Sequence, residues 1–223
     1  MNSDDTRQAT VGRQNQPPRA PSPFWRGVRE WVKVIVIALV IAIPIRYFVA
    51  EPFVVNGASM DPTFSTGQFL IVDRLTYDFE QPQRGDVLVF KYPYPTGTTF
   101  GTSDTYYIKR IIGLPGERVV MNDGTITIDQ PASSSTPEKS FVLDEPYVQA
   151  YHASHDTASF PPDGMPLGPT QYFVMGDNRA ESSDSRAWGP LDRSFFIGRP
   201  FVRLTPLTAV SIYPGHYEAT STR

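Results

Sequence analysis

The chain has 223 residues and a net charge of −3, so its charge gives no reason to expect nucleic-acid binding, which calls for a concentrated basic face. It contains no cysteine, which excludes disulfides, thiolate metal ligands and a cysteine nucleophile. Its 22 prolines and 16 glycines disfavour a helical bundle and favour short strands joined by turns, because proline breaks helix interiors.

The N-terminal quarter of the chain predicts a tail followed by a membrane anchor. Residues 1–24 are polar and proline-rich, which predicts a disordered tail in the cytoplasm. Residues 25–50 are predicted to cross the membrane, because twelve uninterrupted apolar residues lie between Lys33 and Arg46 and aromatic residues extend this run on both sides. Six basic residues against three acidic ones precede the run, which places the N-terminus inside and the remaining chain outside.

Two other interpretations of this apolar run are open. A cleavable signal peptide has an apolar region of about 7 to 15 residues, and run length alone favours it. Against it, the bulky residues Arg46, Tyr47 and Phe48 stand where a small-x-small cleavage site is required. A buried core helix is the third interpretation, and the flanking charges and the basic tail oppose it.

Residues 51–223 are predicted to form a mostly β domain with antiparallel strands. Short alternating runs bounded by turn residues are typical of such domains. The clearest predicted strands are 68–73, 86–92, 105–112, the pair within 117–129 around an Asn-Asp-Gly turn, 171–177, and the FVRL and AVSIY pieces near the end. A loop or insertion is predicted at about 131–169, where 131–140 and 151–169 are rich in Ser and Pro.

Two segments of this domain carry residues suited to peptide hydrolysis. Ser59 has small neighbours and is followed by a proline-containing turn, so it could present its hydroxyl to a substrate, although most such serines only make turns. Strand alternation places Lys109 on one face with Tyr107 and Ile111. Burial there would lower the pKa of the amine and make it a usable base, whereas a surface lysine is the simpler interpretation of the strand alone.

A third segment, residues 176–186, mixes both signs of charge with hydroxyl groups. It predicts either a solvated loop or a network of ion pairs that fixes neighbouring side chains. The histidines offer little chemistry, since His152 and His155 lie in the predicted insertion, a poor place for a Ser-His-Asp triad. The sequence predicts neither a metal nor a cofactor.

Together these segments resemble the type I signal peptidase family, of the bacterial single-anchor kind. The resemblance runs from the anchor to about Pro200, with five motifs in family order: EPF, SMDPT, RGDVLVF, YIKRIIGLPGERV and GDNRAESSDSRAWGP. It implies a β-rich, barrel-like catalytic domain on a single-pass anchor in the cytoplasmic membrane. The implied activity is a serine endopeptidase that removes signal peptides from exported preproteins, cutting after small residues at −1 and −3.

The resemblance also assigns roles to residues, with Ser59 as nucleophile and Lys109 as general base. Supporting roles go to a hydroxyl that holds the lysine, an ion pair, and an acid paired with the arginine after the lysine: Ser182, Asp184 with Arg186, and Asp177 with Arg110. Substrate binding is assigned to residues around the two motifs: Phe53, Val55, Met60, Tyr107 and Ile108. An extended peptide is expected to add to a sheet edge as a strand.

Gly57 departs from one branch of this family. Some members carry Ser or Thr two positions before the nucleophile, and its hydroxyl helps to bind the oxyanion. Here the main-chain N–H of Ser59 remains as one donor and the second donor is unassigned. One such donor contributes about 3 kcal/mol to transition-state stabilisation, so a replacement from backbone or water is expected.

Two alternatives come from other classes of protein. A self-cleaving repressor-type protease uses the same Ser-Lys chemistry, but it requires a DNA-binding helical domain where this chain has its predicted anchor. A membrane-tethered, non-catalytic β module that binds extended peptides is the second alternative. The joint presence of Ser59 and Lys109 disfavours it.

Overall fold

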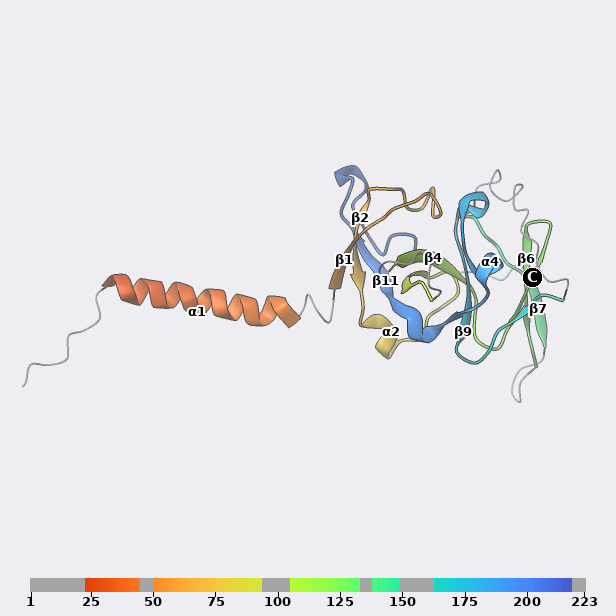
Figure 1. Ribbon diagram of the computed structural model, residues 1–223, viewed down its shortest axis with the longest axis horizontal. Helices are drawn as coiled ribbons and strands as arrows, with labels where there is room; N and C mark the ends of the chain where they lie inside the picture. The colour runs from red at the N-terminus through yellow and green to blue at the C-terminus, as the bar shows by residue number, and fades with distance from the viewer. Residues whose placement is uncertain (1–22, 45–49, 94–104, 133–137, 149–162, 218–223) are drawn as a thin grey trace, which may run out of the picture. The chain divides into compact units, whose positions relative to one another are not determined.

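The computed structural model describes residues 23–44, 50–93, 105–132, 138–148 and 163–217, in two units, Met1–Ile43 and Pro44–Arg223 (Figure 1). His152 and His155, most of the predicted tail and parts of the predicted insertion lie outside the described residues.

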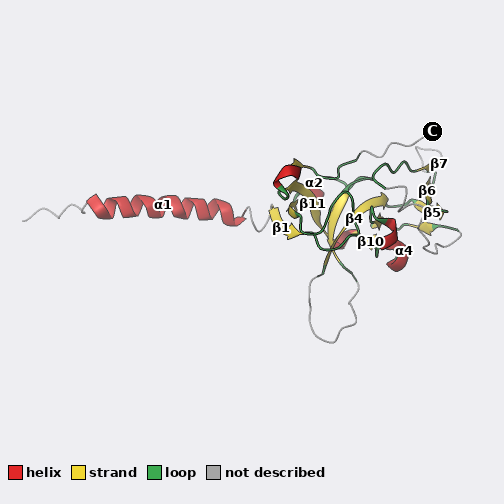
Figure 2. Cartoon of the chain, turned by 90° about the horizontal axis from the view of Figure 1, so that it is seen from above, coloured by secondary structure: helices red, strands yellow, loops and turns green. Residues whose placement is uncertain are grey.

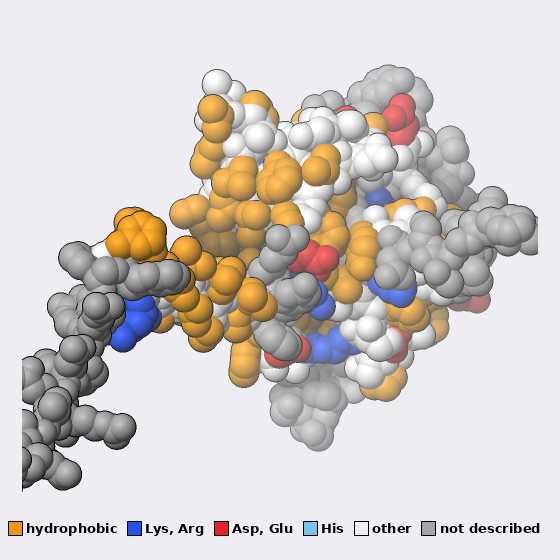
Figure 3. All heavy atoms as spheres, turned by 60° about the vertical axis from the view of Figure 1, so that its left-hand side comes forward, with side chains coloured by type: hydrophobic (Ala, Val, Ile, Leu, Met, Phe, Trp, Pro, Cys, Tyr) orange, Lys and Arg blue, Asp and Glu red, His pale blue; other side chains and the backbone are white. Residues whose placement is uncertain are grey.

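Helix α1, Pro23–Pro44, overlaps residues 25–50, the region predicted as an anchor. Apolar side chains, in orange, cover its visible face (Figure 3), and Val34, Ile37 and Val40 are 57%, 60% and 66% exposed. Among the described residues, however, no helix is both long enough and apolar enough to cross a membrane. In α1, charged residues at Arg29 and Lys33 leave only the C-terminal half as an uninterrupted apolar stretch.

The second unit is built on a large antiparallel sheet, which agrees with the predicted mostly β class. Its strand order is β1-β2-β11-β3-β4-β9-β10, with β12 also paired to β11. The strands are β1 (Ala50–Val54), β2 (Phe69–Asp73), β3 (Val87–Lys91), β4 (Tyr106–Gly113), β9 (Gln171–Met175), β10 (Leu191–Asp192), β11 (Phe196–Arg203) and β12 (Ser211–Ile212). Among the described strands this order is an open path rather than a closed barrel, with β1 and β10 at its ends.

A smaller antiparallel sheet has the order β7-β6-β5-β8. Its strands are β5 (Arg118–Asn122), β6 (Thr125–Gln130), β7 (Lys139–Val142) and β8 (Met165–Pro166). The predicted turn joins β5 to β6, with Asp123 and Gly124 at φ values of 47° and 75°, the left-handed conformation that tight hairpins require. Two views place β5–β7 at the end of this unit opposite β1 (Figures 1 and 2).

The prediction of a loop or insertion at about 131–169 is wrong for β7 and β8. Both strands are short, and each adds to the edge of a strand that already has a partner, β7 to β6 and β8 to β5. Their pairing therefore comes from tertiary context, which a segment rich in Ser and Pro does not reveal. The remaining elements are short: α2 (Thr76–Phe79), α4 (Ser185–Trp188), and the 3-10 helices η2 (Arg179–Glu181), η3 (Arg193–Phe195) and η4 (Leu207–Ala209).

Among the residues that the structure describes, the buried core has three clusters. The first joins the two sheets, because Ile112 of β4 and Phe173 of β9 pack with Val119 and Ile128 of the smaller sheet. A second fills the other face of β3, β4 and β9. The third lies under the loop that follows β1 and contains Met60, which is 1% exposed.

Candidate active site

Ser59 lies in the loop between β1 and β2, and buried neighbours hold this loop. Met60 and Phe64 are 1% and 0% exposed, and the Phe64 N–H donates to the Met60 carbonyl at 2.8 Å. Gly57 has a φ of 109°, which side chains rarely adopt, and its N–H donates to Thr66 Oγ1 at 3.0 Å. The loop is thereby fixed with Ser59 half-buried at its tip.

Lys109 lies in the middle of β4, between β3 and β9, and is 4% exposed. Its Nζ is 2.6 Å from Ser59 Oγ and donates to the Ile108 carbonyl at 3.0 Å. As strand alternation predicts, Tyr107 shares its face, with the ring centroid 5.4 Å from Nζ. The structure thus brings the two candidate residues into direct contact across a separation of 50 positions.

The electrostatic surroundings of Lys109 suit a base. Burial lowers its pKa from 10.5 to about 8, although the carboxylates of Asp184 and Asp177 act in the opposite direction. Loss of solvation penalises the charged ammonium more than the neutral amine. A neutral amine in contact with a hydroxyl can accept its proton.

Asp184 and Arg186 form the predicted ion pair, with Arg186 Nε donating to Asp184 Oδ1 at 2.8 Å. Asp184 also accepts the Gly176 N–H at 3.0 Å. Burial would raise the pKa of Asp184, but the Arg186 guanidinium, the Ser182 hydroxyl and the Gly176 N–H together hold that pKa below its usual value. Asp184 therefore stays charged and fixes the segment that follows β9.

Ser182 lies beside this segment, but not in the contact that the resemblance implies. Its buried Oγ lies near the Asp184 carboxylate, whose pKa it lowers, and no hydrogen bond from Lys109 to it is described. Lys109 Nζ is directed instead at Ser59 and at the Ile108 carbonyl. A role for Ser182 in holding the lysine stays a prediction.

Asp177 and Arg110 form the second predicted pair, and both side chains are buried. Arg110 donates from Nε to Oδ1 at 2.8 Å and from Nη2 to Oδ2 at 2.6 Å. Asp177 Oδ2 also accepts the Thr63 hydroxyl at 2.5 Å, which ties β4 and the segment after β9 to the loop of Ser59. Paired and hydrogen-bonded in this way, the two buried charges are compensated.

The segment 176–178 packs directly on the main chain of the candidate nucleophile. Asn178 donates its N–H to the Ser59 carbonyl and its side-chain amide to the Ala58 carbonyl, both at 3.1 Å. A Cβ on Gly176 would lie only 2.3 Å from the Ser59 carbonyl oxygen. Asn178 was not among the predicted site residues, although it lies within the polar segment 176–186.

A pocket of about 280 Å³ opens beside Ser59 and Lys109. Four of the five predicted substrate-binding residues line it: Phe53, Val55, Tyr107 and Ile108. Met60, the fifth, packs instead in the core under the loop. Gly57 lines the pocket too, while Glu181 and Ser183 supply polar groups. The pocket is mostly apolar, which suits uncharged side chains.

The comparisons with known proteins all indicate the same family. A family model described as "Signal peptidase, peptidase S26" matches residues 28–205. The chain is 37% identical over 194 residues to "Probable signal peptidase I-1" of Synechocystis sp., covering 86% of this chain and 89% of that protein. It is 36% identical over 191 residues to "Signal peptidase I" of Leptolyngbya laminosa, covering 85% and 84%.

A relative from another group of bacteria is similar to the same degree. "Signal peptidase I T" of Bacillus subtilis is 37% identical over 163 residues, which are 70% of this chain and 74% of that protein. Among solved structures, a signal peptidase I from Enterococcus faecalis is 26% identical and covers 54% of this chain and 97% of that one, with a TM-score of 0.38.

Proposed function

Because this chain belongs to the signal peptidase family, peptidase S26, we propose that Ser59 is its nucleophile and Lys109 its general base in removing signal peptides from exported preproteins. The observation that carries this proposal is the 2.6 Å contact between Lys109 Nζ and Ser59 Oγ beside an apolar pocket. A buried amine next to a hydroxyl is the arrangement that Ser-Lys hydrolysis requires.

The proposed mechanism has two steps. Neutral Lys109 takes the Ser59 proton as Oγ attacks the carbonyl carbon of the −1 residue, and the Ser59 N–H donates to the developing oxyanion. The Lys109 ammonium then protonates the leaving amine, and the peptide bond breaks to leave an acyl-enzyme. A water molecule, deprotonated by Lys109, hydrolyses the ester and restores the Ser59 hydroxyl. Neither a metal nor a cofactor takes part.

The proposed substrate is an extended peptide. Strand β1 lies at one end of the larger sheet, and its residue Phe53 lines the pocket together with Val55 just after it. A peptide that adds to a sheet edge gains main-chain hydrogen bonds, while pockets select alternate side chains. This arrangement supports recognition of the small −1 and −3 residues.

The test of the proposed function is cleavage of a preprotein by the purified chain in detergent. We expect wild type to release the mature protein with a single N-terminus, and Ser59→Ala to release none while still binding the peptide. A non-catalytic peptide-binding module would leave the preprotein uncut in both cases. Cleavage by Ser59→Ala at the wild-type rate would refute the assignment of the nucleophile.

The pocket predicts the choice of residue at −1. A preprotein with Ala→Phe at −1 is expected not to be cleaved, because the family resemblance implies a −1 pocket that admits only small side chains, and Tyr107 and Ile108 line the pocket beside Ser59. The measurement is kcat/KM for matched preproteins with Ala, Ser and Phe at −1. Efficient processing of the Phe substrate would contradict the pocket assignment.

The proposed location is the cytoplasmic membrane, with the catalytic unit on its outer side. The exposed apolar side chains of α1 favour contact with lipid, and the basic residues before them favour an N-terminus in the cytoplasm. Protease added to intact spheroplasts should then digest the β unit. If the β unit is protected, or if the mature protein begins near Glu51, this location is wrong.

A further inference from the structure

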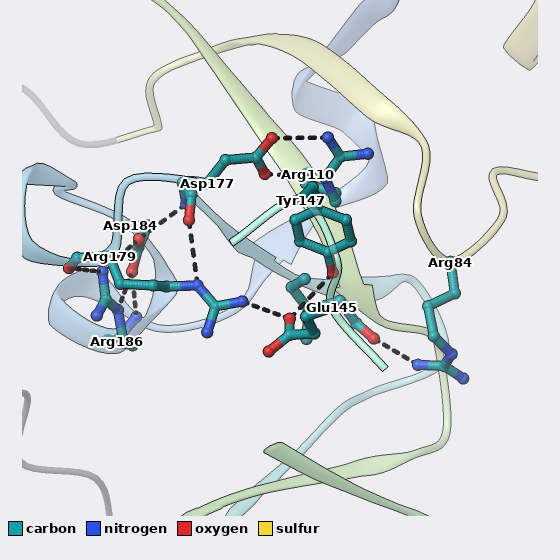
Figure 4. Close-up of polar contacts among 10 residues, drawn as sticks. Arg84, Arg110, Glu145, Tyr147, Asp177, Arg179, Asp184 and Arg186 are labelled. Atoms are coloured by element: carbon teal, nitrogen blue, oxygen red, sulfur yellow. Dashed lines mark hydrogen bonds and ion pairs between the residues drawn. The ribbon is translucent and has the colours of Figure 1, made fainter. Parts of the chain in front are cut away.

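A network of charged side chains extends from the candidate site to the segment that follows β7 (Figure 4). Glu145 and Tyr147 in this segment reach two arginines that hold the site, Arg179 and Arg110. Neither residue belongs to the motifs that carry the family resemblance. We call the pair Glu145 and Tyr147 the strap.

Glu145 is the anionic partner of a buried cation. Its carboxylate accepts from Arg179 Nη2 and from the Tyr147 hydroxyl, the latter at 3.0 Å. The side chains of Arg179 and Glu145 are 1% and 11% exposed. A guanidinium buried this deeply requires an anion beside it, since an unpaired buried charge is strongly unfavourable.

Tyr147 contacts the other arginine with its ring. The Arg110 guanidinium carbon lies 4.0 Å from the ring centroid, a cation–π contact in a buried setting. Burial, with the neighbouring Glu145 carboxylate, raises the pKa of the Tyr147 hydroxyl well above its usual value. The hydroxyl therefore remains a donor to Glu145 throughout the working pH range, and the strap acts as one unit.

The two arginines hold adjacent residues of the segment that packs on Ser59. Arg179 donates from Nε to the Gly176 carbonyl at 3.2 Å, and Arg110 grips the Asp177 carboxylate with two hydrogen bonds. Asn178, the next residue in this segment, donates its N–H to the Ser59 carbonyl. In Figure 4 the Glu145 carboxylate lies between the Arg179 guanidinium and the Tyr147 hydroxyl.

We propose that Glu145 and Tyr147 are positioning residues of the Ser59–Lys109 site: through Arg179 and Arg110 they press segment 176–178 against the Ser59 main chain and keep water from Lys109. This inference rests on the proposed function of Ser59 and Lys109. Glu145 and Tyr147 thereby connect the smaller sheet to the nucleophile, although neither residue lines the pocket.

Loosening the strap has two consequences. Segment 176–178 moves away from Ser59, so the hydroxyl and its main-chain N–H lose their alignment and kcat falls. The pocket residues Phe53 and Ile108 keep their places, so KM changes little.

The second consequence concerns Lys109. When segment 176–178 moves away from Ser59, water reaches the Lys109 amine and reduces its desolvation. The pKa of Lys109 then rises, and the activity profile moves to higher pH. The charged and titratable groups that face Lys109 are Asp177, Asp184, Arg186 and Tyr107, with Glu181 across the pocket. Glu145→Gln and Tyr147→Phe leave all of these groups unchanged.

The test compares Glu145→Gln and Tyr147→Phe with the control Asp144→Asn in the full chain. Glu145→Gln keeps the shape and one acceptor oxygen but removes the charge. Tyr147→Phe keeps the ring on Arg110 and removes the bond to Glu145. Asp144 is exposed in the same segment and accepts only from Tyr217 among the bonds described, so its amide variant leaves the strap intact.

The readouts are kcat and KM on a preprotein between pH 6 and pH 11, with active enzyme counted by titration with a serine-acylating reagent. For Glu145→Gln we expect kcat to fall roughly tenfold or more with KM nearly unchanged, and the midpoint of the pH profile to move upward. Tyr147→Phe should show the same changes to a smaller extent, and Asp144→Asn should match wild type.

A loss of thermal stability in Glu145→Gln with a wild-type kcat per active site and an unmoved pH midpoint would overturn the inference, because the strap would then be structural only. Wild-type values in every readout would overturn it too. If Glu145→Gln does not fold, Tyr147→Phe decides by the same readouts. Failure of the proposed function would give a different result: either wild type would not cleave the preprotein, or Ser59→Ala would cleave it.

Discussion

Lys109→Arg is expected to abolish cleavage as fully as Ser59→Ala, by roughly 10⁴-fold or more in kcat. The arginine would keep the positive charge and much of the length of the side chain, but a guanidinium does not release its proton in a protein. Lys109 Nζ lies 2.6 Å from Ser59 Oγ, where only a neutral amine can take the serine proton. The loss therefore follows from the missing lone pair rather than from a missing charge.

The measurement is single-turnover cleavage of a preprotein, with circular dichroism to show that the variant folds. Lys139→Arg is the matched control, because Lys139 is exposed on β7 in the smaller sheet, whereas Lys109 lies in the larger sheet. This substitution should leave the rate of cleavage unchanged. Cleavage by Lys109→Arg at near the wild-type rate would exclude this lysine as the base.

The same lysine determines the expected pH dependence of the wild-type enzyme. Its pKa is lowered by burial to about 8, so the basic form accumulates as the pH rises through that value. At pH 7 about a tenth of the molecules carry the neutral amine. We expect kcat/KM to climb between about pH 7 and pH 9 and then level off. A profile that falls over this range, or one whose midpoint lies near 10.5, would contradict a buried neutral base.

The sequence predicts most of the larger sheet because its strands carry local signals. Residues 68–73, 86–92, 105–112 and 171–177 alternate or are continuously apolar, and they form β2, β3, β4 and β9. The face of Lys109 was also predictable, since strand alternation depends only on neighbouring positions. Its contact with Ser59 was not, because it requires the register of β4 against strands far away in the chain.

The strap shows what local patterns cannot supply. Glu145 and Arg179 are 34 positions apart, and neither has a neighbour that predicts the other. A Glu-Pro-Tyr sequence in a polar stretch is typical of a surface turn, yet the ring of Tyr147 covers a buried guanidinium. Met60 is the opposite case. The family resemblance assigned it to substrate binding, but its side chain packs in the core that supports the loop.

Gly176→Ala is expected to reduce kcat/KM about 100-fold or more, through steric displacement alone. The added Cβ would lie 2.3 Å from the Ser59 carbonyl oxygen and 2.4 Å from Ser182 Oγ. The first contact is with main chain, which cannot rotate away, so either the loop of Ser59 or the segment after β9 must shift. Overpacking of this kind also costs about 1 to 3 kcal/mol of folding free energy.

Gly168→Ala provides the control in the same β unit. The Cβ there would lie 3.0 Å from Gln171 Oε1, the far end of a flexible side chain that can move aside, so activity and melting temperature should stay close to wild type. Both variants are measured by kcat/KM on a preprotein and by thermal unfolding. Suppose Gly176→Ala unfolds at a lower temperature but cleaves at the wild-type rate. The close approach of Gly176 to Ser59 would then stabilise the fold without aligning the nucleophile.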